Sequence, residues 1–419
     1  MYKNGKVGSF YKIDLDRIGK GWFEMGPIRP PSEGRDCSLL LRVTRNCPWN
    51  RCEFCRTYKN ERYSIRSVEE VKADIDLIRV LSGELKSASW QLGFGETIAQ
   101  EVVAAIINGN PELYSRQYVN DKEVLHQRLH CLAGVANWLY TGGETVFLQD
   151  ANTPQIRTPD LVEILTYLKE KFSSIERVTS YARAKTIARK TLEEMQQLES
   201  SGLSRLHIGL ESGCDEVLVA VKKGVTAEEH IIAGRKTKEA GITLSEYVMP
   251  GLGGRKWSTK HALDSARVLN EIDADFIRLR SFVPRQGSPM YEHIQSGEFE
   301  VLSEDEVIAE IGLFVENLNC NSYLASDQMC NLLGEIEGQL PGDKPAMLKT
   351  IADYLQKPLH ERLRIQLERR LSAYMSVYGG LNEHLAFKVR LAVDALEKKD
   401  PEAEQKVKDV LDAVKPAFI

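Results

Sequence analysis

Cys47-Pro48-Trp49-Asn50-Arg51-Cys52-Glu53-Phe54-Cys55 is the stretch around which the rest of the chain is organised. It places three cysteines within nine residues at the spacing C-x4-C-x2-C. The apolar segment at residues 38–43 directly precedes it and predicts a buried strand. The cysteines are therefore expected on a loop at the C-terminal end of a first strand, where α/β barrels carry their chemistry.

The number of cysteines in this loop restricts the metal site that it can form. Three thiolates are one fewer than the four protein ligands of a closed structural zinc site. A [4Fe–4S] cluster has four irons, so three thiolates would leave one iron open for a small molecule. On the cysteines alone, two alternatives stay open: such a cluster, or a zinc site completed by a distant fourth ligand.

Length and composition describe an ordinary globular protein. The chain of 419 residues is 42% hydrophobic and 27% charged, and its length allows two or three domains or one large α/β barrel with additions. A net charge of −5 gives no support for a broad basic surface, so nucleic acid is not an expected partner. The scattered cysteines do not form a secreted disulfide framework, and neither a signal peptide nor a transmembrane run is evident. We expect a reduced, cytoplasmic protein without a membrane partner.

Strand and helix signals alternate along most of the chain. Helix starts are marked by capping boxes such as Ser67 with Glu70 and Thr191 with Glu194. Strand–helix units in series imply parallel strands with right-handed crossovers. The six expected strands are residues 38–43, 145–148, 177–181, 206–210, 242–249 and 276–279.

Six such units cannot close as eight do, so we predict an α/β fold built as a partial (β/α)6 TIM-like barrel with an open side. The barrel is expected over residues 38–295, with a helical insertion at about 83–141. A leader at residues 1–37 precedes the barrel, and a helical C-terminal region at 296–419 follows it.

The cysteine loop, with Phe54 directly before its last cysteine, resembles the radical S-adenosylmethionine (radical SAM) superfamily. The usual spacing there is C-x3-C-x2-C, and the first gap is one residue longer here. The resemblance covers roughly residues 38–290. It is closest to the branch that contains the oxygen-independent coproporphyrinogen oxidases and the tRNA methylthiotransferases. Ile208–Gly213 resembles the fourth-strand motif of that branch.

The resemblance implies a set of cofactors and a type of chemistry. Cys47, Cys52 and Cys55 would hold a [4Fe–4S] cluster, and the enzyme would cleave S-adenosylmethionine reductively to start radical chemistry. An electron donor such as flavodoxin or ferredoxin and sensitivity to oxygen are also implied. The cofactor carries the difficult chemistry, and the protein supplies orientation and exclusion of water.

The resemblance further implies residues that bind S-adenosylmethionine. Phe54 holds the aromatic position of the motif, Glu211 a contact position on the fourth strand, and Lys223 the basic position for the carboxylate. Tyr181 and Glu246 match contact positions on the third and fifth strands. Each has a structural alternative: Glu211 as a helix cap, Lys223 as a solvated charge, and Glu246 in a strand of uncertain register.

Arg183 joins this set through strand geometry. It shares an alternating face with Tyr181, which places both side chains toward the same side of the sheet. A solvated surface charge is the alternative for Arg183. The Gly251-Leu252-Gly253-Gly254 loop, by contrast, is expected to be a tight turn and is not a dinucleotide-binding fingerprint.

Two carboxylates compete for the ammonium group of the cofactor. Many superfamily members carry Gly-Gly-Glu at the end of the second strand, and this chain has Gly142-Gly143-Glu144. The apolar strand at 145–148 follows Glu144, so the motif lies at its start, about 13 Å from the other end at roughly 3.3 Å per residue. We therefore predict that Asp150, helped by Gln149, receives the ammonium, and that Glu144 is structural.

Arg278, Arg280 and Arg285 lie in or just after the sixth expected strand. Because arginine binds carboxylates and phosphates through paired hydrogen bonds, we hypothesise an anionic substrate. Surface salt bridges outside the barrel are the alternative. Cys320 and Cys330, ten positions apart without a further pair, are expected to be buried thiols rather than ligands of a second cluster.

The leading hypothesis is a radical SAM enzyme with a small-molecule substrate. One alternative is a modification enzyme of the same superfamily that acts on tRNA or protein. Another is a non-catalytic iron–sulfur or zinc protein that keeps the barrel as a scaffold. The acidic and basic positions at the strand ends favour catalysis, because a scaffold does not need them.

Overall fold

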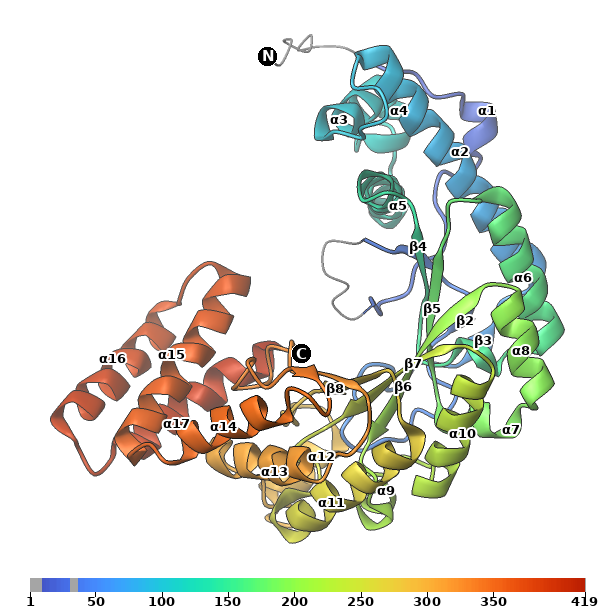
Figure 1. The fold of residues 1–419 in the computed structure, drawn as a ribbon. Helices are drawn as coiled ribbons and strands as arrows, with labels where there is room; N and C mark the ends of the chain where they lie inside the picture. The colour runs from blue at the N-terminus through green and yellow to red at the C-terminus, as the bar shows by residue number, and fades with distance from the viewer. Residues whose placement is uncertain (1–9, 31–36, 419) are drawn as a thin grey trace.

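The computed structural model describes residues 10–30 and 37–418. The rest of the expected leader, residues 1–9 and 31–36, lies outside the described residues. In the described chain the molecule is bent, with the insertion helices at one end and the last helices at the other (Figure 1). None of the described helices is long and apolar enough to cross a membrane.

A curved sheet of eight strands forms the centre of the molecule, in the order β1-β4-β5-β6-β7-β8-β9-β10. The strands from β1 to β9 pair in parallel, and β10 pairs antiparallel with β9. Their bounds are β1 Leu39–Leu41, β4 Thr145–Leu148, β5 Arg177–Ala182, β6 Leu203–Glu211, β7 Thr243–Val248, β8 Phe276–Leu279, β9 Tyr323–Ala325 and β10 Gly338–Gln339. Within the described residues β1 and β10 do not pair, so the barrel is partial and open.

The six expected strands are all present, and the α/β fold with a partial barrel is confirmed. Strands β9 and β10 were not expected from the sequence and lie in the region expected to be helical. Both are short, at three and two residues, so neither shows a periodic pattern. They extend the sheet by pairing next to β8.

Helices that alternate with the strands cover the outer face of the sheet (Figure 1). The expected capping boxes are present at the starts of α2, α8, α10 and α13, where each side chain accepts a backbone N–H. The covering helices are α2 Val68–Leu92, α6 Thr158–Lys171, α7 Ala184–Arg189, α8 Leu192–Ser200, α9 Asp215–Ala220, α10 Ala227–Glu239, α11 Gly254–Ile272 and α13 Glu304–Glu316.

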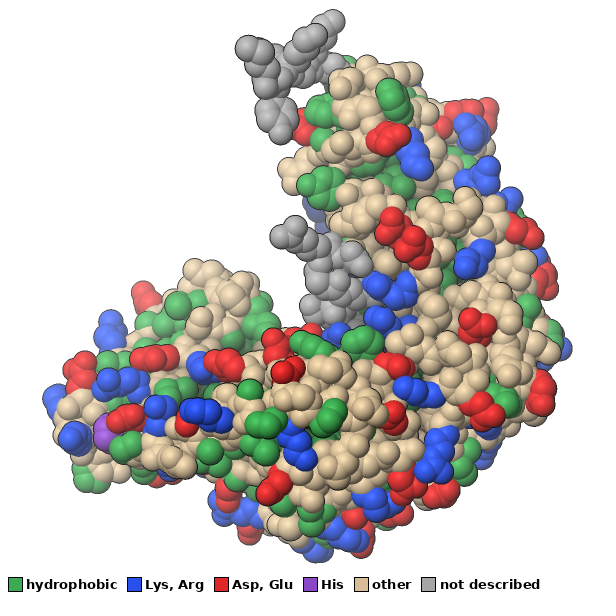
Figure 2. All heavy atoms as spheres, viewed as in Figure 1, with side chains coloured by type: hydrophobic (Ala, Val, Ile, Leu, Met, Phe, Trp, Pro, Cys, Tyr) green, Lys and Arg blue, Asp and Glu red, His purple; other side chains and the backbone are tan. Residues whose placement is uncertain are grey.

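The two ends of the molecule are helical. One end holds α1 Leu15–Ile18, α3 Gln100–Gly109, α4 Pro111–Tyr114 and α5 Lys122–Tyr140. The other end holds α12 Pro289–Gln295, α14 Lys344–Leu355, α15 Leu359–Tyr378, α16 Glu383–Lys398 and α17 Ala403–Val414. Helices α15 to α17 bury an apolar cluster of their own, and their visible face carries acidic and basic side chains interspersed (Figure 2).

The two faces of the sheet differ in composition. Residues in register on neighbouring parallel strands point to the same side. Leu206 and Leu244 are in register and belong to the apolar core shared with the helices. Tyr181 and His207 are in register on the opposite, inner face, where their ring centroids lie 5.6 Å apart. The inner face is therefore an aromatic and polar surface below the carboxyl ends of the strands.

Candidate cofactor site

The cysteine loop lies at the carboxyl end of β1, as the sequence predicts. It connects β2 (Thr44–Arg45) to β3 (Ser64–Ile65), which pair antiparallel and hold the two ends of the loop together. All three loop cysteines are half-buried free thiols. Burial raises the pKa of Cys52 to about 11, Lys223 and Arg183 oppose this rise, and Cys55 and Cys47 add to it. The three thiols and two cations thus lie within electrostatic reach of one another.

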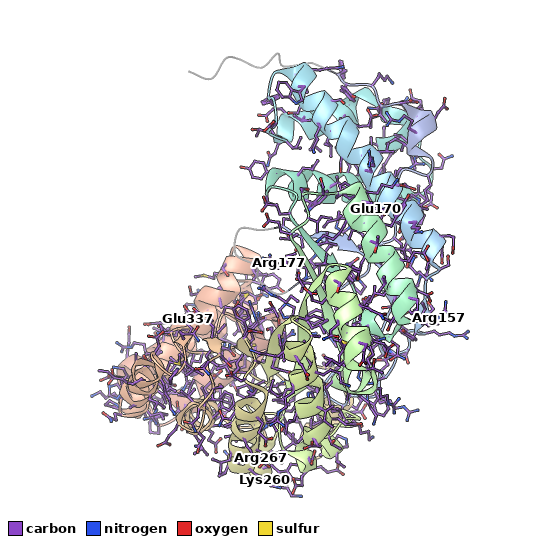
Figure 3. The ribbon with its side chains drawn as sticks, turned by 45° about the vertical axis from the view of Figure 1, so that its right-hand side comes forward. Arg157, Glu170, Arg177, Lys260, Arg267 and Glu337 are labelled. Atoms are coloured by element: carbon purple, nitrogen blue, oxygen red, sulfur yellow. The ribbon has the colours of Figure 1, made fainter. Side chains whose placement is uncertain are left out.

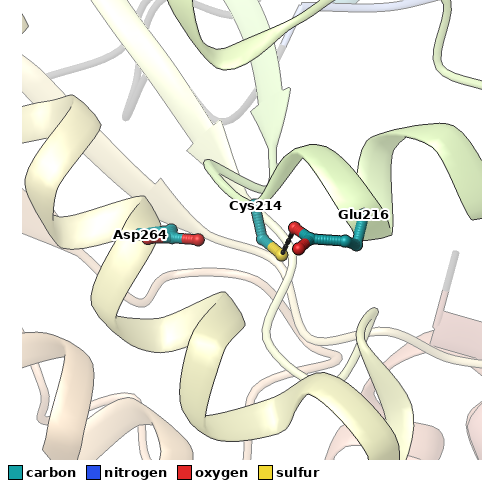
Figure 4. Close-up of side chains that lie close together, drawn as sticks. All are labelled: Cys214, Glu216 and Asp264. Carbon is teal, nitrogen blue, oxygen red and sulfur yellow. Dashed lines mark hydrogen bonds between the residues drawn. The ribbon is translucent and has the colours of Figure 1, made fainter.

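The loop thiols are spread more widely than a zinc site requires. In the part of the chain that is described, one trio of His, Cys, Asp or Glu has all its ligand atoms within 4.8 Å of one another, and it is Cys214, Glu216 and Asp264 (Figure 4). At least one pair of loop sulfurs is therefore farther apart than 4.8 Å. Two thiolates on a tetrahedral zinc, each about 2.3 Å from the metal, would be only about 3.8 Å apart. The donor set fits a polynuclear cluster better than a zinc ion.

The trio in Figure 4 is explained by an ion pair. The Cys214 thiol donates a hydrogen bond of 3.2 Å to Glu216, whose carboxylate also binds the ammonium of Lys260. The same ammonium lies 3.8 Å from Asp264. A lysine thus already neutralises the two carboxylates, and we assign no metal site to them.

Asp150 fastens the cysteine loop to the end of β4. Its carboxylate accepts hydrogen bonds from Tyr58 Oη at 2.6 Å, Arg42 Nε at 2.7 Å and the backbone N–H of Asn46 at 3.2 Å. Asp150 is fully buried, and its φ of +72° lies in the left-handed region. Both carboxylate oxygens are therefore engaged by the loop, and the predicted role of Asp150 toward an ammonium stays a prediction.

Gln149 and Glu144 lie at opposite ends of β4, as the sequence predicts. The Gln149 amide accepts a hydrogen bond from the Gly26 N–H at 2.9 Å and donates to the carbonyls of Gly26 and Ile28. Its side chain therefore holds the N-terminal segment against the rim. Glu144 precedes the strand, and its carbonyl accepts from the N–H of Glu176 at the start of β5.

An ion pair of Glu211 and Lys223 lies at the carboxyl end of β6. The Lys223 Nζ is 2.9 Å from Glu211 Oε1 and 5.7 Å from the centre of the Phe54 ring. Burial lowers the pKa of Lys223, but the charges of Glu211 and Cys52 outweigh burial and leave this pKa above its usual value. Gly209 leaves room for the pair, because a Cβ there would lie 2.2 Å from Glu211 Oε1. Four residues predicted for the site thus converge: Phe54, Cys52, Glu211 and Lys223.

Arg183 and Trp49 form a second contact between the loop and the barrel. The Trp49 indole donates a hydrogen bond of 2.7 Å to the Lys222 carbonyl. Arg183 lies 5.0 Å from the Trp49 ring centre and donates to the Lys223 carbonyl at 2.8 Å. Gly224 has a φ of +70°, and a Cβ there would lie 2.2 Å from Trp49 Cζ2. We call these residues, Trp49, Arg183 and Gly224, the tryptophan clamp.

Trp49 and Gly224 were not expected at the site from the sequence. The available signals were a tryptophan inside the cysteine motif and a glycine directly after the lysine expected to bind the cofactor. Neither indicates a contact by itself, because the two residues are distant in sequence. Their contact also depends on the left-handed backbone at Gly224, which only the structure shows.

Tyr181 and Glu246 lie on opposite faces of the sheet. Tyr181 is half-buried on the inner face and packs against Phe147, with ring centroids 5.3 Å apart. Glu246 is fully buried and is in register with Ile208 and Ile277, which belong to the helix-covered core. Its carboxylate oxygens have no hydrogen-bond partner among the described residues, and burial raises its pKa well above the usual value. A role for either residue toward a cofactor stays a prediction.

The arginines of the sixth expected strand have different environments. Arg278 is in register with Tyr247 on the inner face and forms an ion pair of 2.8 Å with Asp327. Arg280 follows the end of β8, where its backbone N–H donates to the Val248 carbonyl. Cys330 lies within electrostatic reach of Arg280, and burial raises the pKa of its thiol to about 11. Cys320 and Cys330 are both buried free thiols.

One family model and several known proteins are similar to parts of this chain. Residues 109–266, which follow the cysteine loop and extend from α3 into α11, match the family model described as "Radical SAM superfamily". Two curated relatives are tRNA uridine(34) acetyltransferases from Methanocaldococcus infernus, 27% identical over 120 residues, and from Methanocaldococcus jannaschii, 26% identical over 117 residues. Each match covers 28% of this chain and 22% of the relative, so the chain matches about a fifth of their length.

One similar solved structure is a radical S-adenosylmethionine methyltransferase from Kitasatospora setae. It has a TM-score of 0.40 and 15% sequence identity, and the match covers 62% of this chain and 39% of that one. Similarity at this level does not identify a substrate.

Proposed function

The chain belongs to the radical SAM superfamily, and from that premise we propose that it cleaves S-adenosylmethionine reductively at a [4Fe–4S] cluster to begin radical chemistry on a small substrate. Cys47, Cys52 and Cys55 would hold the cluster. When bound there, the cluster would supply the electron for this cleavage. The observation that carries the proposal is the convergence of Cys52, Lys223 and Glu211 at one rim.

The Glu211–Lys223 pair is complementary to the amino-acid end of S-adenosylmethionine. That end is a zwitterion with an ammonium and a carboxylate. Lys223 carries a positive charge at neutral pH and can donate to a carboxylate, while Glu211 can accept from an ammonium or from a ribose hydroxyl. On binding, Lys223 and Glu211 would exchange their contact with each other for contacts with the cofactor. Because the pair is largely buried, these new charge-assisted hydrogen bonds would form out of water, where they are strong.

The tryptophan clamp would orient this pair. It fixes the carbonyls of Lys222 and Lys223 against the cysteine loop, so that the lysine side chain is held at a constant distance from Cys52. Phe54 and Tyr181 would exclude water from the two sides of the cofactor. The substrate would bind above the inner face, with the electron supplied by a donor such as flavodoxin or ferredoxin.

Anaerobic reconstitution tests the proposed function. We expect the protein to bind iron and sulfide and, with a reductant, to release 5′-deoxyadenosine or methionine from S-adenosylmethionine. Cys52→Ala should lose the cluster, while Cys320→Ala, a matched change of a buried thiol elsewhere, should keep it. A wild-type protein that binds no iron, or that binds it without any cleavage under active reductant, would contradict the proposal.

Modification of tRNA is the second candidate function. The curated relatives are tRNA uridine(34) acetyltransferases, and the similarity to them favours RNA as a substrate. A net charge of −5 argues against a broad nucleic-acid surface, so contacts with RNA would have to be local. Stimulation of S-adenosylmethionine cleavage by tRNA, compared with its stimulation by a pool of small metabolites, separates the two candidates.

A further inference from the structure

Three arginines gather at the rim beside the last cysteine of the loop. Arg56 directly follows Cys55 and donates a hydrogen bond of 3.1 Å to the Gln286 carbonyl. Burial lowers the pKa of Arg285, and the positive charges of Arg56 and Arg280 lower it further, while Cys55 opposes them. The hydrogen bond to Gln286 places the Arg56 guanidinium beside the chain at Arg285, and Arg280 and Arg285 both follow the end of β8. We call Arg56, Arg280 and Arg285 the arginine triad.

The arginine triad lacks a counter-charge within the described chain. None of its three members forms an ion pair with a described carboxylate, and the buried Nε of Arg285 has no hydrogen-bond partner there. Arg362 and Arg370 by comparison bind carboxylates, at 2.8 Å from Asp305 and 2.8 Å from Glu304, whereas within the triad Arg280 and Arg285 are half-buried and Arg56 is exposed. Like charges held together repel one another, so this arrangement indicates a site for an anion.

The arginine triad is separate from the Glu211–Lys223 pair. Lys223 and Glu211 belong to the carboxyl end of β6, whereas Arg280 and Arg285 follow β8, with β7 between the two strands. Arg280 also lies within electrostatic reach of the Tyr181 hydroxyl, which places it over the inner face. An anion bound here would lie across the mouth of the barrel from Lys223 and on the Cys55 side of the loop.

The charge of the arginine triad selects among anions. A single carboxylate satisfies one guanidinium fork through two parallel hydrogen bonds. A phosphate group offers more oxygens and more charge, and arginine recognises it in the same bidentate way. Three guanidinium groups without a carboxylate partner among the described residues therefore match a phosphate better than a lone carboxylate.

We propose that Arg56, Arg280 and Arg285 bind a phosphate group of the substrate at the rim beside Cys55. This inference rests on the proposed function and names the chemical class of its substrate. The phosphate belongs either to a small phosphorylated metabolite or to the backbone of an RNA. It holds the substrate by a group that does not react, so that the rest of the molecule is oriented over the inner face.

Binding measurements on the reconstituted protein test the proposal. The probes are pyrophosphate and unfractionated tRNA, titrated in the presence of S-adenosylmethionine. We expect Arg285→Gln and Arg280→Gln to weaken binding of the effective probe by about ten- to a hundred-fold, the loss of one charge-assisted contact. Arg267→Gln is the matched control, because Arg267 lies on the outer face in α11, paired with Glu271 (Figure 3).

The outcomes separate the sources of phosphate and the two proposals. If pyrophosphate binds tightly and both variants weaken its binding, the substrate is a small phosphorylated molecule. If tRNA binds, pyrophosphate displaces it, and both variants weaken its binding, the phosphate belongs to an RNA backbone. Unchanged affinities in both variants, or no binding of either probe, would overturn the arginine triad. A fall in S-adenosylmethionine affinity in Arg285→Gln would also overturn it, by assigning the triad to the cofactor. Iron content and release of 5′-deoxyadenosine, measured on the same samples, test the proposed function independently of these titrations.

Discussion

Replacing Gly224 by alanine should loosen the tryptophan clamp and weaken cofactor binding. Gly224 has a φ of +70°, and the added Cβ would lie 2.2 Å from Cζ2, 2.5 Å from Cε2 and 2.7 Å from Cη2 of Trp49. Atoms of an indole ring cannot bend away singly, so the whole ring must move. Its hydrogen bond to the Lys222 carbonyl and its contact with Arg183 are then lost together.

The size of the effect follows from these contacts. A neutral hydrogen bond contributes about 1 kcal/mol, and a cation–π contact at a partly exposed site about 0.5–1 kcal/mol. If binding of S-adenosylmethionine requires Trp49 to be in place, the loss of both contacts makes the free energy of binding about 1.5–2 kcal/mol less favourable. This corresponds to roughly a 10- to 30-fold rise in the Kd of S-adenosylmethionine. A separate cost of about 1 kcal/mol for a non-glycine residue in the left-handed region lowers the free energy of unfolding.

Gly379→Ala is the matched control for the backbone cost. Gly379 ends α15 with a φ of +72°, and an added Cβ there would meet nothing within 4 Å. Both variants should unfold at a lowered temperature, Gly224→Ala at the lower one because it also loses the Trp49 contacts, and only Gly224→Ala should bind S-adenosylmethionine more weakly by calorimetry. Equal cofactor affinity in the two variants, with iron content unchanged, would refute the clamp.

Three further outcomes are expected. Cys52→Ala should abolish the visible absorbance of the reconstituted cluster and Cys320→Ala should retain it, and retained iron and sulfide in Cys52→Ala would contradict the ligand assignment. Asp150→Ala should weaken S-adenosylmethionine binding strongly, whether Asp150 acts on the ammonium or through the loop, and Glu144→Ala should barely change it. The reverse order would show that the cofactor does not bind at the carboxyl end of β4. Because its carboxylate partner raises the pKa of Lys223, the protonated lysine persists at alkaline pH and its contribution is lost only as pH rises through that pKa. Calorimetry should therefore find that Lys223→Met binds S-adenosylmethionine about ten-fold or more weakly than the wild type at each pH from about 7 to 9.

The strands of the barrel could be predicted because each is a buried apolar run bounded by turn signals. The chain order then fixed which end of each strand carries chemistry, and this distinguished Asp150 from Glu144. The two strands that escaped prediction are too short to show a period, and their pairing depends on the neighbouring β8 rather than on their own residues.

The candidate site was predictable where a residue's role depends on chain position and not where it depends on partners. The three cysteines stand out by their spacing, and Glu211 and Lys223 were expected from the resemblance to the radical SAM superfamily. The saturation of Asp150 by Arg42 and Tyr58 does not, because those partners reach it through the path of the cysteine loop. Which face of the sheet the Glu246 side chain occupies likewise depends on the register of β7, and the sequence alone does not reveal that register.

The fastening of the cysteine loop at Asp150 bears on how a metal centre is assembled in this protein. Asn46, near one end of the loop, also donates a hydrogen bond of 2.7 Å to the carbonyl of Arg62 near the other end. The chain has thus already given up the conformational entropy of closing this loop, which in many small metal-binding domains is given up only when the ion arrives. These hydrogen bonds hold the loop through groups that are not metal ligands, so removal of the metal by a chelator should leave a folded protein that can be reloaded.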